Sequence, residues 1–435
     1  MISLKHLFFL SVSLTVINAF ATSPHWSLSD CMAQAKKASL KLQSVKLSEE
    51  KAAVSLKQAK NERYPNLSAS INQSLYDSPF KSGPQDHYRL NLGLSSSMKL
   101  WDGGATTLTI ENRLLRKQSI FFQIEQTWLE IQESVLNSYI SLLAAEGNVQ
   151  VARAAFLLAE EDLKHIQYLF EAGSLTQKDL VLAKSEHAQK KAAVLLAEQT
   201  VENGRTSLRQ LIEIPRESEL KIEAPEFNIT NPNEMPPLPT LADLFTDIQK
   251  NYPGLLADSI DILASQKEEA IASKTNSIIV SLGASASTGL NAWESSAYGN
   301  QVKDGYSHNL SLGINIPLID NGATTTNVLQ AQISVTQARL NKRDTEKSLE
   351  NAIELLYLNA ESADLQWEAA ILQKEAAEEV LRVAEEHRTY GIMAYTDFLE
   401  QKNKFEVAEL NLNKAKYNSL LMRKRIDLYR GFFKS

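Results

Sequence analysis

The chain has 435 residues, of which 43% are hydrophobic and 22% are charged. This composition supports a sizeable folded core and excludes an intrinsically disordered protein. The net charge of −7 indicates no general affinity for nucleic acid, and the single cysteine, Cys31, excludes an intramolecular disulfide.

The first 21 residues have the pattern of a secretory signal peptide. Lys5 precedes an apolar stretch at residues 7–17, and small residues lead to Ala21. We therefore expect cleavage after Ala21 and export of the mature chain. A lipoprotein anchored at Cys31 is disfavoured, because this cysteine lies well beyond the apolar stretch.

Four segments beyond the signal alternate apolar and polar residues with the period of two that is typical of strands. They are residues 66–76, 88–100, 280–290 and 306–318. Their polar faces carry Ser, Asn and Gly, and such segments are long enough to cross a bilayer at a tilt. No run of about 18 apolar residues predicts a transmembrane helix. Two interpretations stay open on alternation alone, a membrane barrel or a two-faced sheet on a soluble core.

Long segments typical of helix follow each pair of strands. The first spans about residues 105–171, and at about 1.5 Å per residue it would be on the order of 100 Å long. A second helix is expected at about residues 176–212, and the second half of the chain repeats both at about 323–390 and 396–429. Helices of this length predict a coiled-coil-like rod.

The two halves are an internal duplication. The stretch "LWDGGATT" returns as "LIDNGATT", so that Asp320 follows Asp102 at the same distance (320 − 102 = 218) as Gly391 follows Gly173 (391 − 173 = 218). Each half reads helix, strand, strand, long helix, turn, helix. The expected organisation is a signal peptide at 1–21, a first repeat at 22–221, a Pro-rich linker at 222–240 and a second repeat at 241–435.

Each copied stretch marks a strand-to-helix joint. A strand ends there and a very long helix begins, so the backbone needs the freedom that Gly and Asn provide. Aspartate offers a capping oxygen to the free amides of the first helical turn. The joint residues are Asp102, Gly103, Gly104, Asp320, Asn321 and Gly322.

These joints, together with the turns "GSLTQKD" and "GIMAYTD" and the duplicated halves, resemble the outer-membrane efflux protein (TolC) family over nearly the whole mature chain. The family often has Pro shortly before the joint. Pro317 fits this pattern, whereas Lys99 occupies the equivalent place in the first half.

The resemblance implies a mixed α and β membrane protein, in which a long α-helical barrel is continuous with a transmembrane β-barrel. Each chain would supply four strands to a 12-stranded barrel in a homotrimer. The strand count agrees independently that several chains are needed, because four strands cannot close a barrel for which about eight is the practical minimum. Strand counting alone would also allow two or four chains.

By position, the resemblance assigns three acidic residues to a periplasmic entrance gate: Asp397, Glu400 and Asp179. A ring of carboxylates constricts a pore and favours cations. A purely structural interpretation stays open, because Asp397 and Glu400 have capping-box spacing and Asp179 lies in a first helical turn. The adaptor-facing tip turns would be formed by Gly173, Ser174, Leu175, Gly391, Ile392 and Met393.

The implied function is an outer-membrane exit duct of a Gram-negative bacterium, with its helical part in the periplasm, for efflux of small molecules or type I secretion. Its partners would be further copies of the chain, a periplasmic adaptor (membrane fusion) protein, an inner-membrane transporter and outer-membrane lipid. No enzyme activity, cofactor or metal is expected, because the chain has no HExxH zinc motif, no phosphate loop and no Gly-x-Ser-x-Gly elbow. The alternative is an exported coiled-coil structural or adhesive protein, against which the long duplicated pattern argues.

Overall fold

The computed structural model describes residues 25–75, 88–223, 227–291 and 298–431. The expected signal peptide lies outside these residues. Contacts divide the chain into two compact units. The first unit comprises Met1–Lys37, Val135–Met235 and Trp367–Tyr417, and the second comprises Ala38–Ser134, Pro236–Gln366 and Asn418–Ser435. Each unit therefore draws on both sequence repeats.

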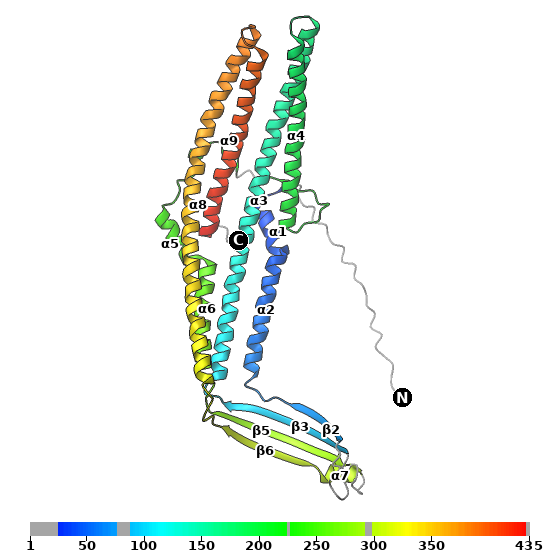
Figure 1. Ribbon diagram of the computed structural model, residues 1–435, viewed down its shortest axis with the longest axis vertical. Coiled ribbons are helices and arrows are strands. Elements are labelled where there is room, and N and C mark those ends of the chain that lie inside the picture. Colours follow the sequence, from blue (N-terminus) through cyan, green and yellow to red (C-terminus); the bar gives the residue numbers. More distant parts are fainter. Residues whose placement is uncertain (1–24, 76–87, 224–226, 292–297, 432–435) are drawn as a thin grey trace. The chain divides into compact units, whose positions relative to one another are not determined.

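The second unit contains a four-stranded antiparallel sheet, shown in Figure 1. Its order is β2-β3-β5-β6, from β2 (Ser68–Leu75), β3 (Tyr88–Trp101), β5 (Ile279–Asn291) and β6 (Ser307–Asn315). All four expected strands are confirmed. β6 stops before the expected residue 318, where Pro317 has no backbone N–H to donate to a ladder.

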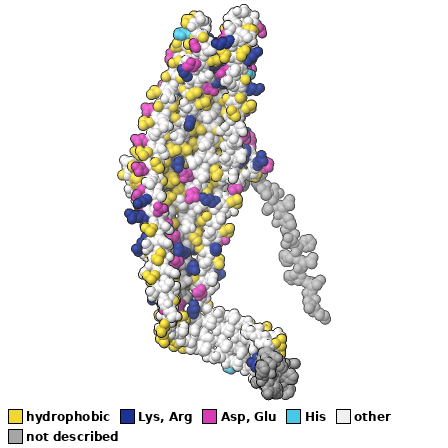
Figure 2. Space-filling view, in the orientation of Figure 1, with side chains coloured by type: hydrophobic (Ala, Val, Ile, Leu, Met, Phe, Trp, Pro, Cys, Tyr) yellow, Lys and Arg dark blue, Asp and Glu magenta, His cyan; other side chains and the backbone are white. Residues whose placement is uncertain are grey.

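This sheet exposes apolar side chains along both of its edge strands. Every residue of β2 and of β6 is exposed, and Ile71 and Leu310 reach 74% and 73% exposure. The four described strands of this sheet contain no acidic residue, and their only Lys or Arg residues are Arg89 and Lys99. On the face visible in Figure 2, the sheet accordingly shows almost no charge. Open edges and apolar exposure of this kind are typical of a sheet that pairs with further strands and faces lipid.

The expected long helices are confirmed to within one or two residues. They are α3 (Ala105–Glu171), α4 (Gln177–Leu211), α8 (Ala323–Thr389) and α9 (Tyr395–Arg430). α3 and α8 each have 67 residues, as the constant offset between the repeats predicts.

Shorter elements complete the described chain. They are β1 (His25–Trp26), α1 (Leu28–Ala38), α2 (Leu40–Asn61), β4 (Lys221–Ile222), η2 (Pro232–Glu234), α5 (Leu241–Asn251), α6 (Pro253–Ala272) and α7 (Tyr298–Asp304). β1 and β4 pair in parallel within the first unit. In the second unit, Leu244 and Ile248 of α5 are buried in a core with Leu349, Ile353 and Ile426.

Among the described helices, α3 is the one long and apolar enough to cross a membrane by length and composition. Its most apolar 18-residue window has a mean hydropathy of 1.2. A single helix of this kind is weak evidence, since the core helices of soluble proteins pass the same test.

Candidate functional site: helix tips and strand-to-helix joints

The two helix tips of the first unit end in the same backbone motif. Gly173 and Gly391 both have positive φ, 72° and 71°. After α3, the N–H of Gly173 donates to the carbonyl of Phe170 and that of Ser174 to the carbonyl of Leu169, both at 2.9 Å. The bonds after α8 are equivalent. These are Schellman caps, for which glycine is needed because side chains disfavour this conformation.

The tip residues divide into exposed and packed ones. Gly173, Ser174, Gly391 and Ile392 are exposed, and Ile392 is 72% exposed. The other two predicted tip residues, Leu175 and Met393, pack instead against a buried cluster formed by Ile166, Leu180, Ala183, Ala384, Tyr395 and Phe398. The four exposed residues offer the larger accessible surface, while Leu175 and Met393 are half-buried and anchor the turns on this cluster.

Asp179 is hydrogen-bonded to Thr176, the N-cap residue of α4. The Thr176 backbone N–H donates to Asp179 Oδ2 at 3.1 Å, and the Asp179 N–H donates to Thr176 Oγ1 at 3.3 Å. This reciprocal pair is a capping box. Asp179 thus lies in the first turn of α4, as the structural interpretation expects, and it also completes a capping box that was not predicted from the sequence.

Asp397 occupies the equivalent place in α9 without an equivalent cap. α9 begins at Tyr395, so Asp397 lies within its first turn rather than at the N-cap, and the capping-box interpretation of Asp397 with Glu400 is wrong. The N-cap position is Ala394, which has no side-chain acceptor. Asp397 is exposed, and within the described part of the chain its carboxylate accepts only one hydrogen bond, from the neighbouring Thr396 hydroxyl to Oδ1 at 3.3 Å. Its carboxylate is consequently freer than that of Asp179.

We expect the change Thr176→Ala to destabilise the first unit by about 1 kcal/mol, because it removes the cap of α4. The matched change Thr396→Ala, which removes no cap, should leave stability nearly unchanged. Thermal unfolding followed by circular dichroism measures both. Equal effects of the two changes would contradict a capping role for Thr176.

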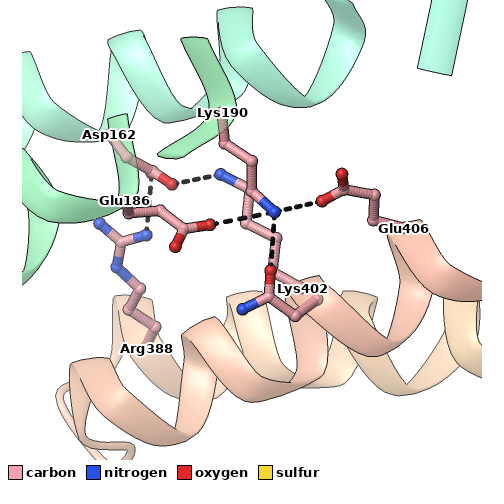
Figure 3. A network of polar contacts seen from close by, with 7 residues as sticks. Asp162, Glu186, Lys190, Arg388, Lys402 and Glu406 are labelled. Atoms are coloured by element: carbon pink, nitrogen blue, oxygen red, sulfur yellow. Dashed lines mark hydrogen bonds and ion pairs between the residues drawn. The ribbon is translucent and has the colours of Figure 1, made fainter. Parts of the chain in front are cut away.

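A compact network of charges lies in the same unit, as Figure 3 shows. Asp162 of α3 accepts from Lys402 Nζ at 2.6 Å and from Arg388 Nη1 at 3.0 Å. These three side chains are only 20%, 9% and 22% exposed. The Arg388 guanidinium also lies 4.5 Å from the centre of the Phe398 ring, where a cation is stabilised by the ring face.

Lys190 of α4 forms the second centre of this network. It donates to Asn403 at 2.8 Å, forms an ion pair with Glu186 at 3.3 Å and contacts Glu406. Burial lowers the pKa of Lys190, but the hydrogen bond and charge of Glu406 and the charge of Glu186 outweigh burial and raise it overall. The ion pairs thus keep their full stabilisation below the ordinary lysine pKa and lose it only as the pH rises through the raised one.

Sequence reasoning did not find this network. Glu186 and Lys190 have the i, i+4 spacing of a helical ion pair, which is visible in the sequence but common on solvated helices. The partners of Asp162 are 226 and 240 residues away, so no local pattern identifies them.

At the two joints the structure supplies the expected capping bonds. Asp102 accepts from the N–H groups of Gly104 at 3.2 Å and Thr106 at 2.9 Å, and it also contacts the Thr106 hydroxyl. Asp320 accepts in the same way from Gly322 at 3.1 Å and Thr324 at 2.9 Å.

The joint residues that follow the aspartates have left-handed backbone conformations. Their φ angles are 68° at Gly103, 88° at Gly104, 51° at Asn321 and 79° at Gly322. Glycine and asparagine are the residues that adopt this conformation most readily, which accounts for their presence at both joints.

Comparisons with known proteins agree with this architecture. A family model described as outer membrane efflux protein matches residues 32–212 and 249–431. A similar solved structure is the CmeC outer membrane channel of Campylobacter jejuni, with a TM-score of 0.79 and 17% identity over 93% of this chain and 85% of that one. No curated protein matches the chain.

Two further solved structures have the same fold. The outer membrane protein VceC of Vibrio cholerae has a TM-score of 0.73 and 17% identity, over 93% of this chain and 96% of that one. The MtrE outer membrane channel of Neisseria gonorrhoeae, in its open state, has a TM-score of 0.71 and 19% identity, over 93% of this chain and 88% of that one.

Proposed function

We propose that this chain, which belongs to the outer membrane efflux protein family, assembles as a homotrimer and works with a periplasmic adaptor and an inner-membrane transporter. The protein is an outer-membrane exit duct for efflux. The family finding removes the basis for a coiled-coil structural or adhesive protein. The two repeats at 22–221 and 241–435, joined by the linker at 222–240, would descend from a duplication, which the equal lengths of α3 and α8 support.

The observation that supports the trimer is the four-stranded sheet with two open edges, β2 and β6. Pairing of β6 with β2 of the next copy would continue the sheet, and three copies supply twelve strands. Light scattering on protein extracted from outer membranes in mild detergent, corrected for bound detergent, measures the mass. A trimer supports the proposal, and a detergent-independent monomer or dimer overturns it.

The adaptor would dock on the exposed tip residues Gly173, Ser174, Gly391 and Ile392. Backbone and small side chains there leave room for a close approach of another protein. Photo-crosslinking from position 174 or 392 in cells tests this assignment. Leu175, which is half-buried in the same turn, should give a weaker crosslink than either exposed position.

Asp397 is the gate residue with the strongest support, because its carboxylate is exposed and uncapped. We expect Asp397→Asn to reduce the cation preference of the channel by about twofold, since it removes one charge per chain from a carboxylate ring. Ala394→Thr would supply a capping acceptor, engage Asp397 and shift selectivity in the same direction. Asp179→Asn should mainly affect stability. Reversal potentials in planar bilayers measure these effects, and an unchanged Asp397→Asn channel would contradict the assignment.

Glu400 gives a prediction about pH. Its hydrogen bond with Lys404, at 2.7 Å, and the charge of that lysine hold the pKa of Glu400 below its ordinary value. A lowered pKa means that Glu400 stays ionised to a lower pH than an ordinary glutamate does. We therefore expect Glu400 to stay ionised between about pH 7 and pH 5, which lies just above the ordinary glutamate pKa. The change in conductance over this interval should then be the same in wild type and in Glu400→Gln. A difference between them would show that Glu400 titrates there.

A further inference from the structure

A pocket of about 370 Å³ opens at the first strand-to-helix joint, within the second unit. It is lined by Glu62 and Arg63 after α2, by Lys99 and Trp101 at the end of β3, and by Thr107 in α3. We propose that this pocket binds the head group of a membrane phospholipid that carries a phosphodiester and an ammonium group. The inference rests on the proposed function, because lipid reaches the pocket only if the strands cross the outer membrane.

The phosphodiester would be held by two cations. Arg63 Nη2 donates to Thr107 Oγ1 at 3.2 Å, which orients the guanidinium and leaves most of its five N–H donors free. Lys99 is exposed, and within the described part of the chain its ammonium group makes no hydrogen bond or ion pair. Arginine and lysine are the side chains that bind phosphate oxygens most strongly.

The carboxylates of the pocket differ in what they can still bind. Asp102 is occupied by the N–H groups of Gly104 and Thr106 and by the Thr106 hydroxyl, so it serves the helix start. Glu62 is exposed at the end of α2. It supplies a carboxylate for the ammonium of a zwitterionic head group, whereas a head group that is only anionic leaves this charge unmatched.

Trp101 adds a second indication of lipid. Its side chain is 60% exposed, and it is the last residue of β3. A membrane-crossing strand leaves the hydrocarbon at this position. Tryptophan at a strand end, beside basic residues, is typical of the membrane–water interface, because the ring is apolar and its N–H needs a polar partner.

The second joint offers an internal comparison. With the constant offset of the repeats, Lys99 corresponds to Pro317 (99 + 218 = 317) and Trp101 to Ile319 (101 + 218 = 319). The second joint thus lacks both the ammonium group and the indole, while Asp320 keeps the capping role of Asp102. The lysine and tryptophan that would hold a lipid are therefore present at the first joint but not at the second, which predicts one lipid per chain.

Native mass spectrometry of the full, delipidated protein in detergent tests this inference. Phosphatidylethanolamine is added, and bound lipid is counted. We expect saturation at one lipid per chain, and at least about tenfold weaker binding by the double variant Arg63→Gln, Lys99→Gln. The matched control is Lys57→Gln, which removes an exposed charge from α2 outside the pocket and should bind as wild type does.

Each result decides the question. Equal binding by wild type and the double variant, or no saturable binding, overturns the inference. Stronger binding of phosphatidylglycerol than of phosphatidylethanolamine overturns the role of Glu62. Equal affinity for phosphatidylethanolamine and for soluble glycerophosphoethanolamine overturns the inference that the ligand is a membrane lipid. If the double variant does not fold, Lys99→Gln alone replaces it, with about threefold weaker binding expected. Light scattering separates the two proposals, since a wild-type trimer that binds no lipid fails only this one.

Discussion

Replacing Asp162 by asparagine is expected to destabilise the first unit by about 3 kcal/mol, because it leaves Lys402 and Arg388 largely buried without their counter-charge. The loss should appear as a lower midpoint of urea unfolding, followed by circular dichroism. The same change should broaden the distribution of channel conductances, since Arg388 lies three residues before Gly391 and also contacts the Phe398 ring that packs beneath the tips.

Glu160→Gln is the matched control for Asp162→Asn. Glu160 is on the same helix and forms an i, i+4 pair with Lys164, but both side chains are exposed, at 39% and 68%. Exposed pairs of this kind add little to stability, so this variant should unfold as wild type does.

A second variant separates an unpaired charge from a general packing defect. Adding Lys402→Met to Asp162→Asn removes one of the stranded cations and should recover part of the lost stability. If Asp162→Asn unfolds at the same urea concentration as Glu160→Gln, the network does not stabilise the first unit.

Gly103→Ala should have the other large effect, a destabilisation of about 3 kcal/mol or a failure to assemble. A β-carbon at this position would lie 2.5 Å from both Cβ and Oγ of Ser277, closer than atoms can approach without a shift. The φ of 68° adds strain for any side chain. The yield of trimer in outer-membrane extracts and its unfolding midpoint measure the effect.

Two other glycines of the joints isolate the contribution of the backbone. Gly104 and Gly322 have φ of 88° and 79°, but a β-carbon at either position would have no neighbour within 4 Å. Their alanine variants should lose only the conformational term, about 1 kcal/mol. When Gly103→Ala is combined with Ser277→Gly, the destabilisation should fall to the same level as in these two alanine variants. If all three single variants behave alike, the contact with Ser277 is not what requires glycine at position 103.

The sequence by itself determined the features that depend on neighbours along the chain. The period of two in β3 and β5 and the proline-free run of α3, with a single glycine, predicted these elements almost to the residue. The glycines at 173 and 391 predicted the turns, because a left-handed backbone is a local requirement. Repetition at a constant offset then predicted equal helices in both halves.

Only the tertiary structure decided which side chains carry function-related contacts. Asp179 and Asp397 are equivalent by spacing, yet Asp179 is held in a capping box with Thr176, whereas Ala394 stands in the place of Thr176 before Asp397 and the Asp397 carboxylate accepts only from the neighbouring Thr396 hydroxyl within the described part of the chain. The pairing of Asp162 with Lys402, 240 residues away, and the meeting of Arg63 with Lys99 in one pocket depend on how helices and strands pack. Local sequence carries no record of such contacts, because they arise from the free energy of the whole fold rather than from the preferences of adjacent residues.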